Sequence, residues 1–197
     1  ERTGTHMADG YARASNKPGV IIAGQNGPGA TNLVTGVAQA KAAFSPVIAI
    51  AGSYSTKDKM EDAFQGLDQQ SLFAPITKKT WTVKNSKIIP KIMSDAFNLA
   101  MKPRRGPVCL NLPRNILAAS NSYNINTKKP SFTNENKQKG NRENIKKAVK
   151  LIGSSTCSVI IVGAGIKYNS SFKEVIKLAE LCNVPVSYTH LTLPTMS

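Results

Sequence analysis

Decisive for the fold is the stretch Gln25-Asn26-Gly27-Pro28-Gly29-Ala30-Thr31-Asn32. It follows the apolar run of residues 20–23 and precedes a helical pattern, so we predict a tight turn from a strand into a helix. Two glycines that flank a proline allow the backbone to approach another group closely. The helix that follows would direct its free N–H groups at the same place. The stretch therefore predicts a ligand-binding loop.

Strand and helix patterns alternate outward from this turn. The uninterrupted apolar runs are typical of a parallel sheet that is covered on both faces. Predicted strands are residues 20–23, 47–51, 81–83 and 108–112, and predicted helices are residues 3–14, 31–43 and 87–101. Residues 52–70 are polar and are predicted to be irregular. These elements predict an α/β domain with a doubly wound, mainly parallel sheet over residues 1–117.

The composition changes after this domain. Residues 118–142 are rich in Asn, Ser, Thr and Lys and contain few apolar residues, which is typical of a linker. Beyond it we expect a helix over 143–152, a strand over 159–162, a turn at Gly163-Ala164-Gly165, a helix over 171–181 and a strand that begins at Val184. Residues 143–185 are therefore predicted to be the start of a second, truncated Rossmann-like α/β domain.

The last residues differ in kind from the rest of the chain. Residues 186–195 read Val-Ser-Tyr-Thr-His-Leu-Thr-Leu-Pro-Thr, which is similar to the translation of a transposase-end sequencing adapter. We therefore expect residues 186–197 to be a non-native tail and exclude them from the fold. His190 carries no functional weight for the same reason.

The charge and the cysteines bear on partners and compartment. The net charge is +15, from 26 Lys+Arg against 11 Asp+Glu, but the basic residues are spread along the chain and no nucleic-acid module is evident. We therefore expect no nucleic-acid partner, and no apolar run is long enough to predict a membrane span. The three cysteines, Cys109, Cys157 and Cys182, are far apart, which argues against disulfides and a zinc site. We expect buried or nearly buried thiols in a cytoplasmic protein.

An ordered set of motifs resembles a known family. The first half is similar to the pyrimidine-binding domain of thiamine-diphosphate-dependent enzymes in the acetolactate synthase and pyruvate oxidase group, and residues 143–185 resemble the start of the central domain of that group. The motifs that carry the resemblance are Glu1, His6-Met7-Ala8-Asp9-Gly10-Tyr11-Ala12-Arg13, Lys17-Pro18-Gly19-Val20, Gly27-Pro28-Gly29-Ala30-Thr31-Asn32, Asp62-Ala63-Phe64-Gln65 and Gly106-Pro107-Val108. Each motif alone is weak, but as an ordered set they are specific.

The resemblance assigns a catalytic role to Glu1. A glutamate is usually a surface carboxylate, but the offset of Glu1 from Met7-Ala8-Asp9-Gly10 matches the catalytic glutamate of the family. There a buried carboxylate binds the aminopyrimidine ring nitrogen of thiamine diphosphate and favours the imino tautomer. That tautomer can remove the thiazolium C2 proton to give the ylide.

The resemblance also assigns residues to the cofactor and the substrate. Gly27 and Pro28 would lie against the aminopyrimidine, with Asn32 as a polar anchor, although Gln25-Asn26 replaces the commoner Thr-Ser of the family. Phe64 would contact the cofactor and Gln65 the cofactor or substrate. A Phe packed into the core beside a solvated Gln is the structural alternative. A turn with no ligand is the alternative for Gly27.

A third group of residues matches positions near flavin and the substrate channel in acetolactate synthases. Arg104 and Arg114 match such positions, although both are equally consistent with surface cations. Gly163 and Gly165 would approach FAD where FAD is present. The third glycine of a dinucleotide fingerprint would fall at Tyr168, so this turn is not a complete GxGxxG motif.

The resemblance implies a part of an acetolactate synthase-like enzyme of branched-chain amino acid biosynthesis, which decarboxylates pyruvate and transfers the two-carbon unit to a 2-oxo acid. Sulfoacetaldehyde acetyltransferase, whose loop has a similar Gln-Asn-Gly-Pro-Gly run, is the enzymatic alternative. A flavin- or nucleotide-binding module is the non-enzymatic one. The family binds the diphosphate and Mg²⁺ through a C-terminal domain in a homodimer or homotetramer. We therefore expect residues 1–197 to be inactive alone, and exposed sheet edges to make them poorly soluble.

Overall fold

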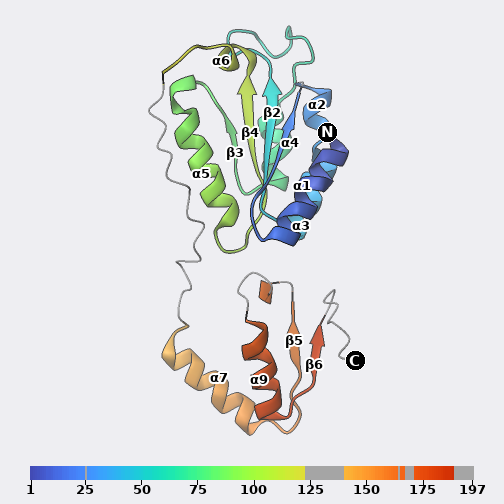
Figure 1. The fold of residues 1–197 in the computed structure, drawn as a ribbon, viewed down its shortest axis with the longest axis vertical. Coiled ribbons are helices and arrows are strands. Elements are labelled where there is room, and N and C mark those ends of the chain that lie inside the picture. Colours follow the sequence, from blue (N-terminus) through green and yellow to red (C-terminus); the bar gives the residue numbers. More distant parts are fainter. Residues whose placement is uncertain (25, 123–139, 164, 167–170, 189–197) are drawn as a thin grey trace. The chain divides into compact units, whose positions relative to one another are not determined.

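The computed structural model describes residues 1–24, 26–122, 140–163, 165–166 and 171–188. The chain divides into two compact units, residues 1–132 and residues 133–197. Each unit is described by itself below (Figure 1). Of the predicted segments, Gln25, Ala164, residues 123–139 of the linker and residues 189–197 of the tail lie outside the described residues.

The first unit contains a four-stranded, wholly parallel sheet. Its strands are β1 (Gly19–Ala23), β2 (Val47–Ser53), β3 (Thr80–Thr82) and β4 (Val108–Pro113), in the order β1-β2-β4-β3. All four arrows in Figure 1 point the same way, so the carboxyl ends of the strands share one edge of the sheet. The predicted parallel α/β architecture is confirmed.

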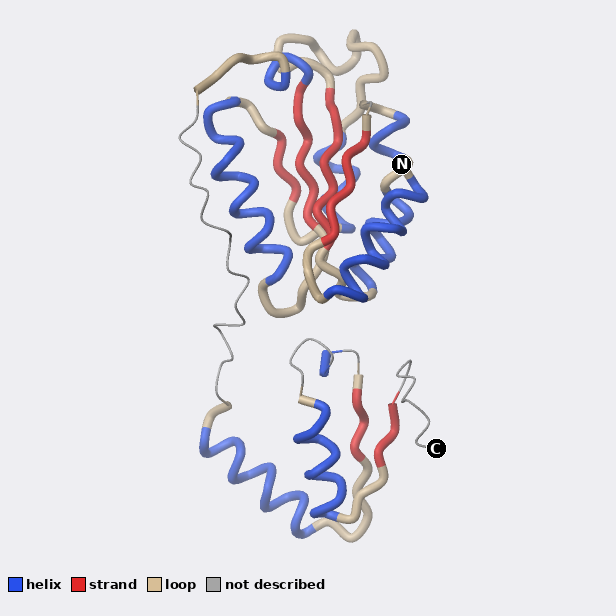
Figure 2. The backbone as a smooth tube through the Cα atoms, in the orientation of Figure 1, coloured by secondary structure: helices blue, strands red, loops and turns tan. Residues whose placement is uncertain are grey.

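Helices cover both faces of this sheet, as Figure 2 shows. One face is covered by α1 (Arg2–Ser15), α3 (Val34–Ala42) and α4 (Gln69–Phe73), and the other by α5 (Ile89–Met101). Shorter elements join them: α2 (Pro28–Thr31), the 3-10 helices η1 (Ala74–Ile76) and η2 (Ser86–Ile88), and α6 (Arg114–Leu117). The arrangement is doubly wound, as the sequence predicts.

Alternate residues of the strands explain this layering, because successive side chains of a strand point to opposite faces. On β2, Ile48 and Ile50 pack against α5, whereas Ala49 and Ala51 pack beneath α3 and α4. On β4, Leu110 packs on the α5 side of the sheet and Cys109 on the opposite side. The two faces therefore have separate cores on either side of one sheet.

Helix α1 is fixed to the neighbouring helix α3 by a buried carboxylate. Asp9 is 3% exposed and accepts hydrogen bonds from Arg13 Nε at 2.9 Å and Nη2 at 2.7 Å. Gln39 Nε2 of α3 donates to the same carboxylate at 3.4 Å. These bonds compensate the burial of the charge and set the position of α1, whose first turn begins beside Glu1.

Several local predictions are wrong in detail. The helix predicted over 31–43 is two helices, α2 and α3, because Leu33 N–H bonds to Ala30 O at 3.1 Å and tightens the turn between them. The segment predicted as irregular over 52–70 contributes its first two residues to β2 and its last two to α4. Helix α4 begins there because Asp68 caps it by accepting from Ser71 N–H at 3.0 Å.

In the described residues of the second unit, two strands pair beside the helices α7 (Arg142–Ser154) and α9 (Phe172–Cys182). The strands are β5 (Ile160–Val162) and β6 (Val186–Tyr188), which are parallel. The final strand begins at Val186 and not at Val184. Its three residues therefore belong to the segment that we expect to be a non-native tail. Backbone pairing explains this, because it does not depend on the side chains. The domain limits and the adapter origin of the tail stay predictions.

The expectation of buried or nearly buried cysteines is wrong for one of the three. Cys109 is buried and Cys182 is half-buried, but Cys157 is exposed. Cys157 lies in the turn before β5, which begins only at Ile160. Burial raises the pKa of the Cys109 thiol, so this cysteine stays protonated.

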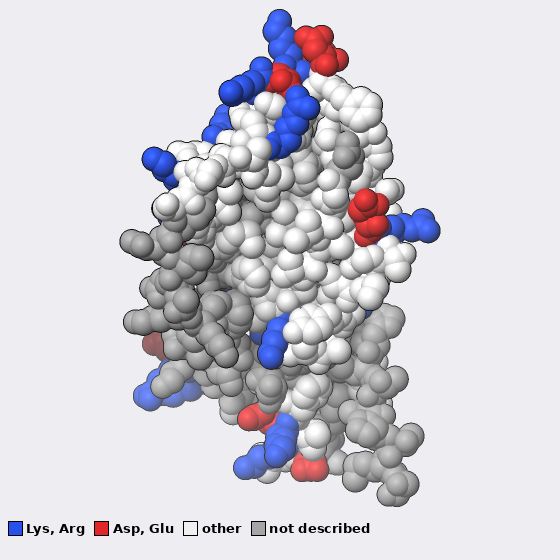
Figure 3. Space-filling model, turned by 45° about the horizontal axis from the view of Figure 1, so that its top comes forward, with Lys and Arg blue, Asp and Glu red and all other residues white. Residues whose placement is uncertain are grey.

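The surface charges are interspersed on the face that Figure 3 shows. Lys and Arg stand singly or in small groups among Asp and Glu, and they do not form a continuous stripe there. Among the described residues, no helix combines the length and the apolar character that crossing a membrane requires. The absence of nucleic-acid and membrane partners remains a prediction.

Candidate functional site

The predicted turn after β1 lies at the carboxyl edge of the sheet, where α/β proteins commonly bind ligands. Gly27 is buried and has φ 56° and ψ −107°, a backbone conformation that side chains strongly disfavour. A Cβ at this position would lie 2.8 Å from both Cβ and O of Gln65. Glycine therefore allows the turn and the segment around Gln65 to approach each other.

Glu1 and Asn32 meet beside this turn. Asn32 Nδ2 donates a hydrogen bond to Glu1 Oε2 at 3.2 Å, across 31 positions of sequence. Glu1 precedes α1 as its N-cap residue, but its side chain does not cap the helix and is free to reach Asn32. The expected burial of Glu1 is wrong for this chain, in which the residue is exposed because it precedes the first turn of a surface helix.

The loop of residues 54–68, which joins β2 to α4, provides the opposite side of the site. Asn26 Nδ2 donates to Phe64 O at 2.8 Å and to Gln65 O at 3.2 Å. Gln65 has φ 54°, and Phe64 is 76% exposed, so the loop presents both side chains outward. A Cβ on Gly66 would lie 2.0 Å from Met60 O, which shows how tightly this loop is wound.

The beginning of the same loop is fixed by α6. Asn115 accepts from Thr56 N–H at 3.0 Å and donates to Thr56 Oγ1 at 2.9 Å. Arg114 Nη2 lies 2.8 Å from Asp58 Oδ2. Arg114, predicted for the substrate channel, therefore lies at the carboxyl edge of the sheet and binds the 54–68 loop.

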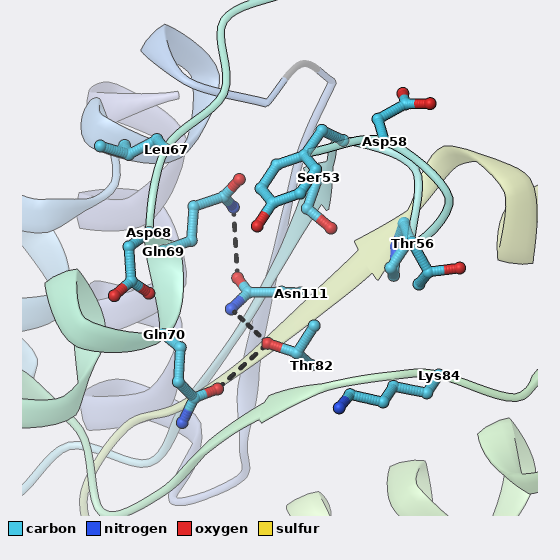
Figure 4. A pocket seen from close by; sticks show the side chains of 12 residues that line it. Ser53, Thr56, Asp58, Leu67, Asp68, Gln69, Gln70, Thr82, Lys84 and Asn111 are labelled. Atoms are coloured by element: carbon cyan, nitrogen blue, oxygen red, sulfur yellow. Dashed lines mark hydrogen bonds between the residues drawn. The ribbon is translucent and has the colours of Figure 1, made fainter. Parts of the chain in front are cut away.

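A polar cavity of about 260 Å³ lies between the 54–68 loop and the ends of β2, β3 and β4 (Figure 4). Gln69 is its central residue and is 3% exposed. Its Nε2 donates to Gly52 O at 3.0 Å and to Asn111 Oδ1 at 3.2 Å. In this part of the chain Gln69 Oε1 and Ser53 Oγ have no hydrogen-bond partner. The lining residues are Ser53, Tyr54, Thr56, Asp58, Leu67, Asp68, Gln69, Gln70, Thr82, Lys84, Asn111 and Pro113.

The hydrogen bonds continue from Asn111 toward the edge of the sheet. Asn111 Nδ2 donates to Thr82 Oγ1 at 3.4 Å, and Thr82 Oγ1 donates to Gln70 Oε1 at 3.1 Å (Figure 4). Gln70 Nε2 completes the series by donating to Thr80 O at 3.1 Å. Neither this network nor the role of Asn26 is predicted from the sequence. The only sequence signal is the unusual Gln25-Asn26 pair.

Arg104 is not brought into this site, and two further predicted residues belong to the second unit. Arg104 precedes β4 and so lies at the amino edge of the sheet, where its guanidinium stands 5.5 Å from the centre of the Phe44 ring. Gly163 and Gly165 belong to the second unit, where Gly163 follows β5 and accepts from Ile166 N–H at 3.3 Å. The flavin roles of these three residues stay predictions.

The residues at the turn fit one part of thiamine diphosphate. A carboxylate that accepts one bond from Asn32 retains acceptor capacity for a ring N–H, and the Gly27 turn is free of a Cβ on the side of Gln65. Among the described residues, no group of three or more His, Cys, Asp or Glu could hold a metal ion. The fit concerns the aminopyrimidine.

Comparisons with known proteins agree with this geometry. Residues 1–72 match the family described as thiamine pyrophosphate enzyme, N-terminal TPP binding domain, where thiamine pyrophosphate is another name for thiamine diphosphate. Glu1, Gly27, Pro28 and Asn32 lie inside the matched range, as do Phe64 and Gln65.

Relatives match almost the whole chain. A "Probable acetolactate synthase large subunit" of Methanococcus aeolicus is 41% identical over 192 residues, which are 96% of this chain and 32% of the relative. Acetolactate synthase large subunits of Buchnera aphidicola and Lactococcus lactis are 39% and 34% identical over 95% and 100% of this chain, and 33% and 34% of the relatives. The chain spans about a third of the length of the curated relatives it matches.

A solved structure shows the same fold. The X-ray structure of a protein from Mycobacterium smegmatis, titled "a putative thiamin diphosphate-dependent enzyme", aligns with a TM-score of 0.78 at 21% identity, over 96% of this chain and 36% of that one. Residues 1–72 therefore match the N-terminal TPP binding domain of thiamine pyrophosphate enzymes, and the chain is similar to acetolactate synthase large subunits along nearly its whole length.

Proposed function

We propose that this chain is the pyrimidine-binding part of an acetolactate synthase-like enzyme, which acts on pyruvate and a second 2-oxo acid. The observation that supports this most is the contact between Glu1 and Asn32 beside the buried Gly27 turn, with Gln65 on its far side. Thiamine diphosphate, when bound, supplies the electron sink for decarboxylation. Mg²⁺ and the diphosphate are assigned to a part of the enzyme that this chain does not contain.

The residues of this chain have distinct tasks in the proposal. Glu1 accepts a hydrogen bond from the ring nitrogen of the aminopyrimidine and so holds a proton there. Asn32 orients that carboxylate through its amide, and Gly27 and Pro28 bring the backbone close to the ring. Gln65, fixed on the 54–68 loop, contacts cofactor or substrate from the opposite side. Arg114, through its contact with Asp58, holds the 54–68 loop at the entrance to the substrate channel.

Further assignments belong to the same proposal. We assign the enzyme to the cytoplasm, to branched-chain amino acid biosynthesis, and to a homodimer or homotetramer. FAD, if bound, is expected near Arg104, Gly163 and Gly165 of the assembled enzyme. Analysis of products from pyruvate, and separately from sulfoacetaldehyde with phosphate, distinguishes this function from the acetyltransferase with a similar Gln-Asn-Gly-Pro-Gly run.

The test of the central assignment is Glu1→Gln in the full-length enzyme. Glutamine keeps the size of the side chain but cannot hold the proton, so turnover of pyruvate should fall by roughly 10²- to 10⁴-fold. Glu180→Gln makes the same chemical change at an exposed position of α9 and should leave turnover unchanged. Full activity of Glu1→Gln would refute the proposed function.

A further inference from the structure

The turn before α2 and the 54–68 loop meet through one side chain. Asn26 Nδ2 carries two hydrogens, and each has an acceptor: Phe64 O at 2.8 Å and Gln65 O at 3.2 Å. Asn26 is separated from Phe64 by 38 positions of sequence and from Gln65 by 39. Asn26 therefore joins the turn predicted to face the cofactor to the segment predicted to contact cofactor or substrate.

The backbone on which Asn26 acts is in an uncommon conformation. Gln65 has φ 54°, in the left-handed region that residues other than glycine rarely adopt. Its Cβ and its O each lie 2.8 Å from the point that a Cβ on Gly27 would occupy. Such a conformation persists only when the surrounding contacts hold it, and the two bonds from Asn26 end on this residue and its neighbour.

We propose that Asn26 is a positioning residue, which sets where Gln65 stands by holding the Phe64 and Gln65 carbonyls against the Gly27 turn. This inference rests on the proposed function, because it takes Gln65 as the group that contacts cofactor or substrate. Asn26 acts by keeping the left-handed backbone of Gln65 in place while the reaction proceeds.

Substitutions at Asn26 separate donation from volume. Asn26→Asp has almost the same shape but directs a carboxylate at two carbonyl oxygens, so it should displace Gln65 more than Asn26→Ala does. A residue that only fills space would tolerate Asp. In the full-length enzyme, we expect Asn26→Asp to lower kcat/KM for pyruvate by roughly 10- to 100-fold, from the loss of two hydrogen bonds.

A double-mutant cycle shows whether Asn26 acts through Gln65. If it does, Asn26→Asp in a Gln65→Ala background should change kcat/KM by no more than about twofold. Equal losses in both backgrounds would overturn the inference. If Asn26→Asp does not fold, Asn26→Ser takes its place in the cycle. The matched control is Asn98→Asp, on an exposed part of α5.

Hydrogen exchange gives a readout that does not depend on activity. Gly66 N–H bonds to Ala63 O at 2.9 Å, within the turn that contains Gln65. Asn26→Asp should accelerate exchange of the Gly66 amide, and an unchanged rate would overturn the inference. The Glu1→Gln variant, measured in the same assay, keeps the two proposals separate: if it is inactive while Asn26→Asp behaves as the parent, only the role of Asn26 fails.

Discussion

Gly27 links the backbone to the chemistry at the scale of a single residue. Its φ of 56° and ψ of −107° direct the chain from β1 into α2, and its missing side chain leaves room for Gln65. Any larger residue would be strained twice, once by its own dihedral angles and once by contact with Gln65. The identity of this residue therefore fixes the separation of two segments that are far apart in sequence.

We expect Gly27→Ala to lower the free energy of unfolding by about 1–3 kcal/mol, the usual cost of a side chain in such a conformation. Urea unfolding followed by fluorescence of Trp81, the single tryptophan, measures this change. Gly24→Ala is the matched control, because nothing lies within 4 Å of a Cβ there. Equal midpoints for the two variants would contradict the strain assigned to Gly27.

At the scale of elements, the short helix α4 depends on Asp68, the residue that caps its amino end. Hydrogen bonds from the side chain and the backbone N–H of Ser71 lower the pKa of Asp68 from its ordinary 3.8. The folded protein therefore binds this proton less readily than the unfolded chain does. The carboxylate stabilises the fold at any pH above 3.8, and this contribution is lost as the pH falls through the lower folded value.

Two substitutions separate the cap from the charge. Asp68→Ala should lower the free energy of unfolding at neutral pH by about 1 kcal/mol, because the N–H of Ser71 loses its acceptor. Asp68→Asn retains a capping oxygen but does not titrate. The difference in free energy of unfolding between the parent and Asp68→Asn should therefore shrink below pH 3.8, and a difference that is constant with pH would count against this role.

Elements with a strong local pattern are predictable from sequence, and elements set by tertiary contacts are not. The apolar stripes of α1 and α5 and the buried runs of β2 and β4 give the fold class. The separation of α2 from α3 depends on one bond at Leu33, and α6 depends on contacts with the 54–68 loop. Neither the bond at Leu33 nor the contacts of α6 produce a periodic pattern of apolar residues in the sequence.

The site divides in the same way. Glu1, Gly27, Asn32 and Gln65 belong to recognisable motifs, and the structure brings them to one edge of the sheet. Asn26 and the Gln69 network were missed because their partners are remote in sequence. Arg104 lies at the opposite edge because it precedes a parallel strand whereas Gly27 follows one, a distinction that the sequence order already contains.

At the scale of the whole first unit, α5 covers the centre of its face and leaves β1 open. Val20 and Ile22 are 44% and 67% exposed on that face, and β1 is an edge strand. An apolar strand edge invites pairing with another chain. We therefore expect residues 1–197 to self-associate as the concentration rises, in line with the low solubility predicted from sequence.

Ile22→Lys should reduce this association, because a charge on an edge strand opposes pairing between chains. Light scattering over a range of concentrations measures the mean mass. Ala42→Lys, at the exposed end of α3, adds the same charge away from β1 and serves as the control. Equal association of both variants would locate the contact elsewhere.

A series of side chains joins Gly52 to Thr80: Gln69 donates toward both ends, and each later side chain donates toward Thr80. The series runs from Gln69 through Asn111 and Thr82 to Gln70, with a main-chain carbonyl as the acceptor at either end. Because both ends are acceptors that cannot reverse, no amide in the series can flip without setting two donors or two acceptors face to face. Chemical ageing by deamidation of Asn111 would turn its donating nitrogen into an acceptor, so one hydrolysed bond would break the series where it crosses from β4 to β3, while the backbone pairing of these two strands would remain.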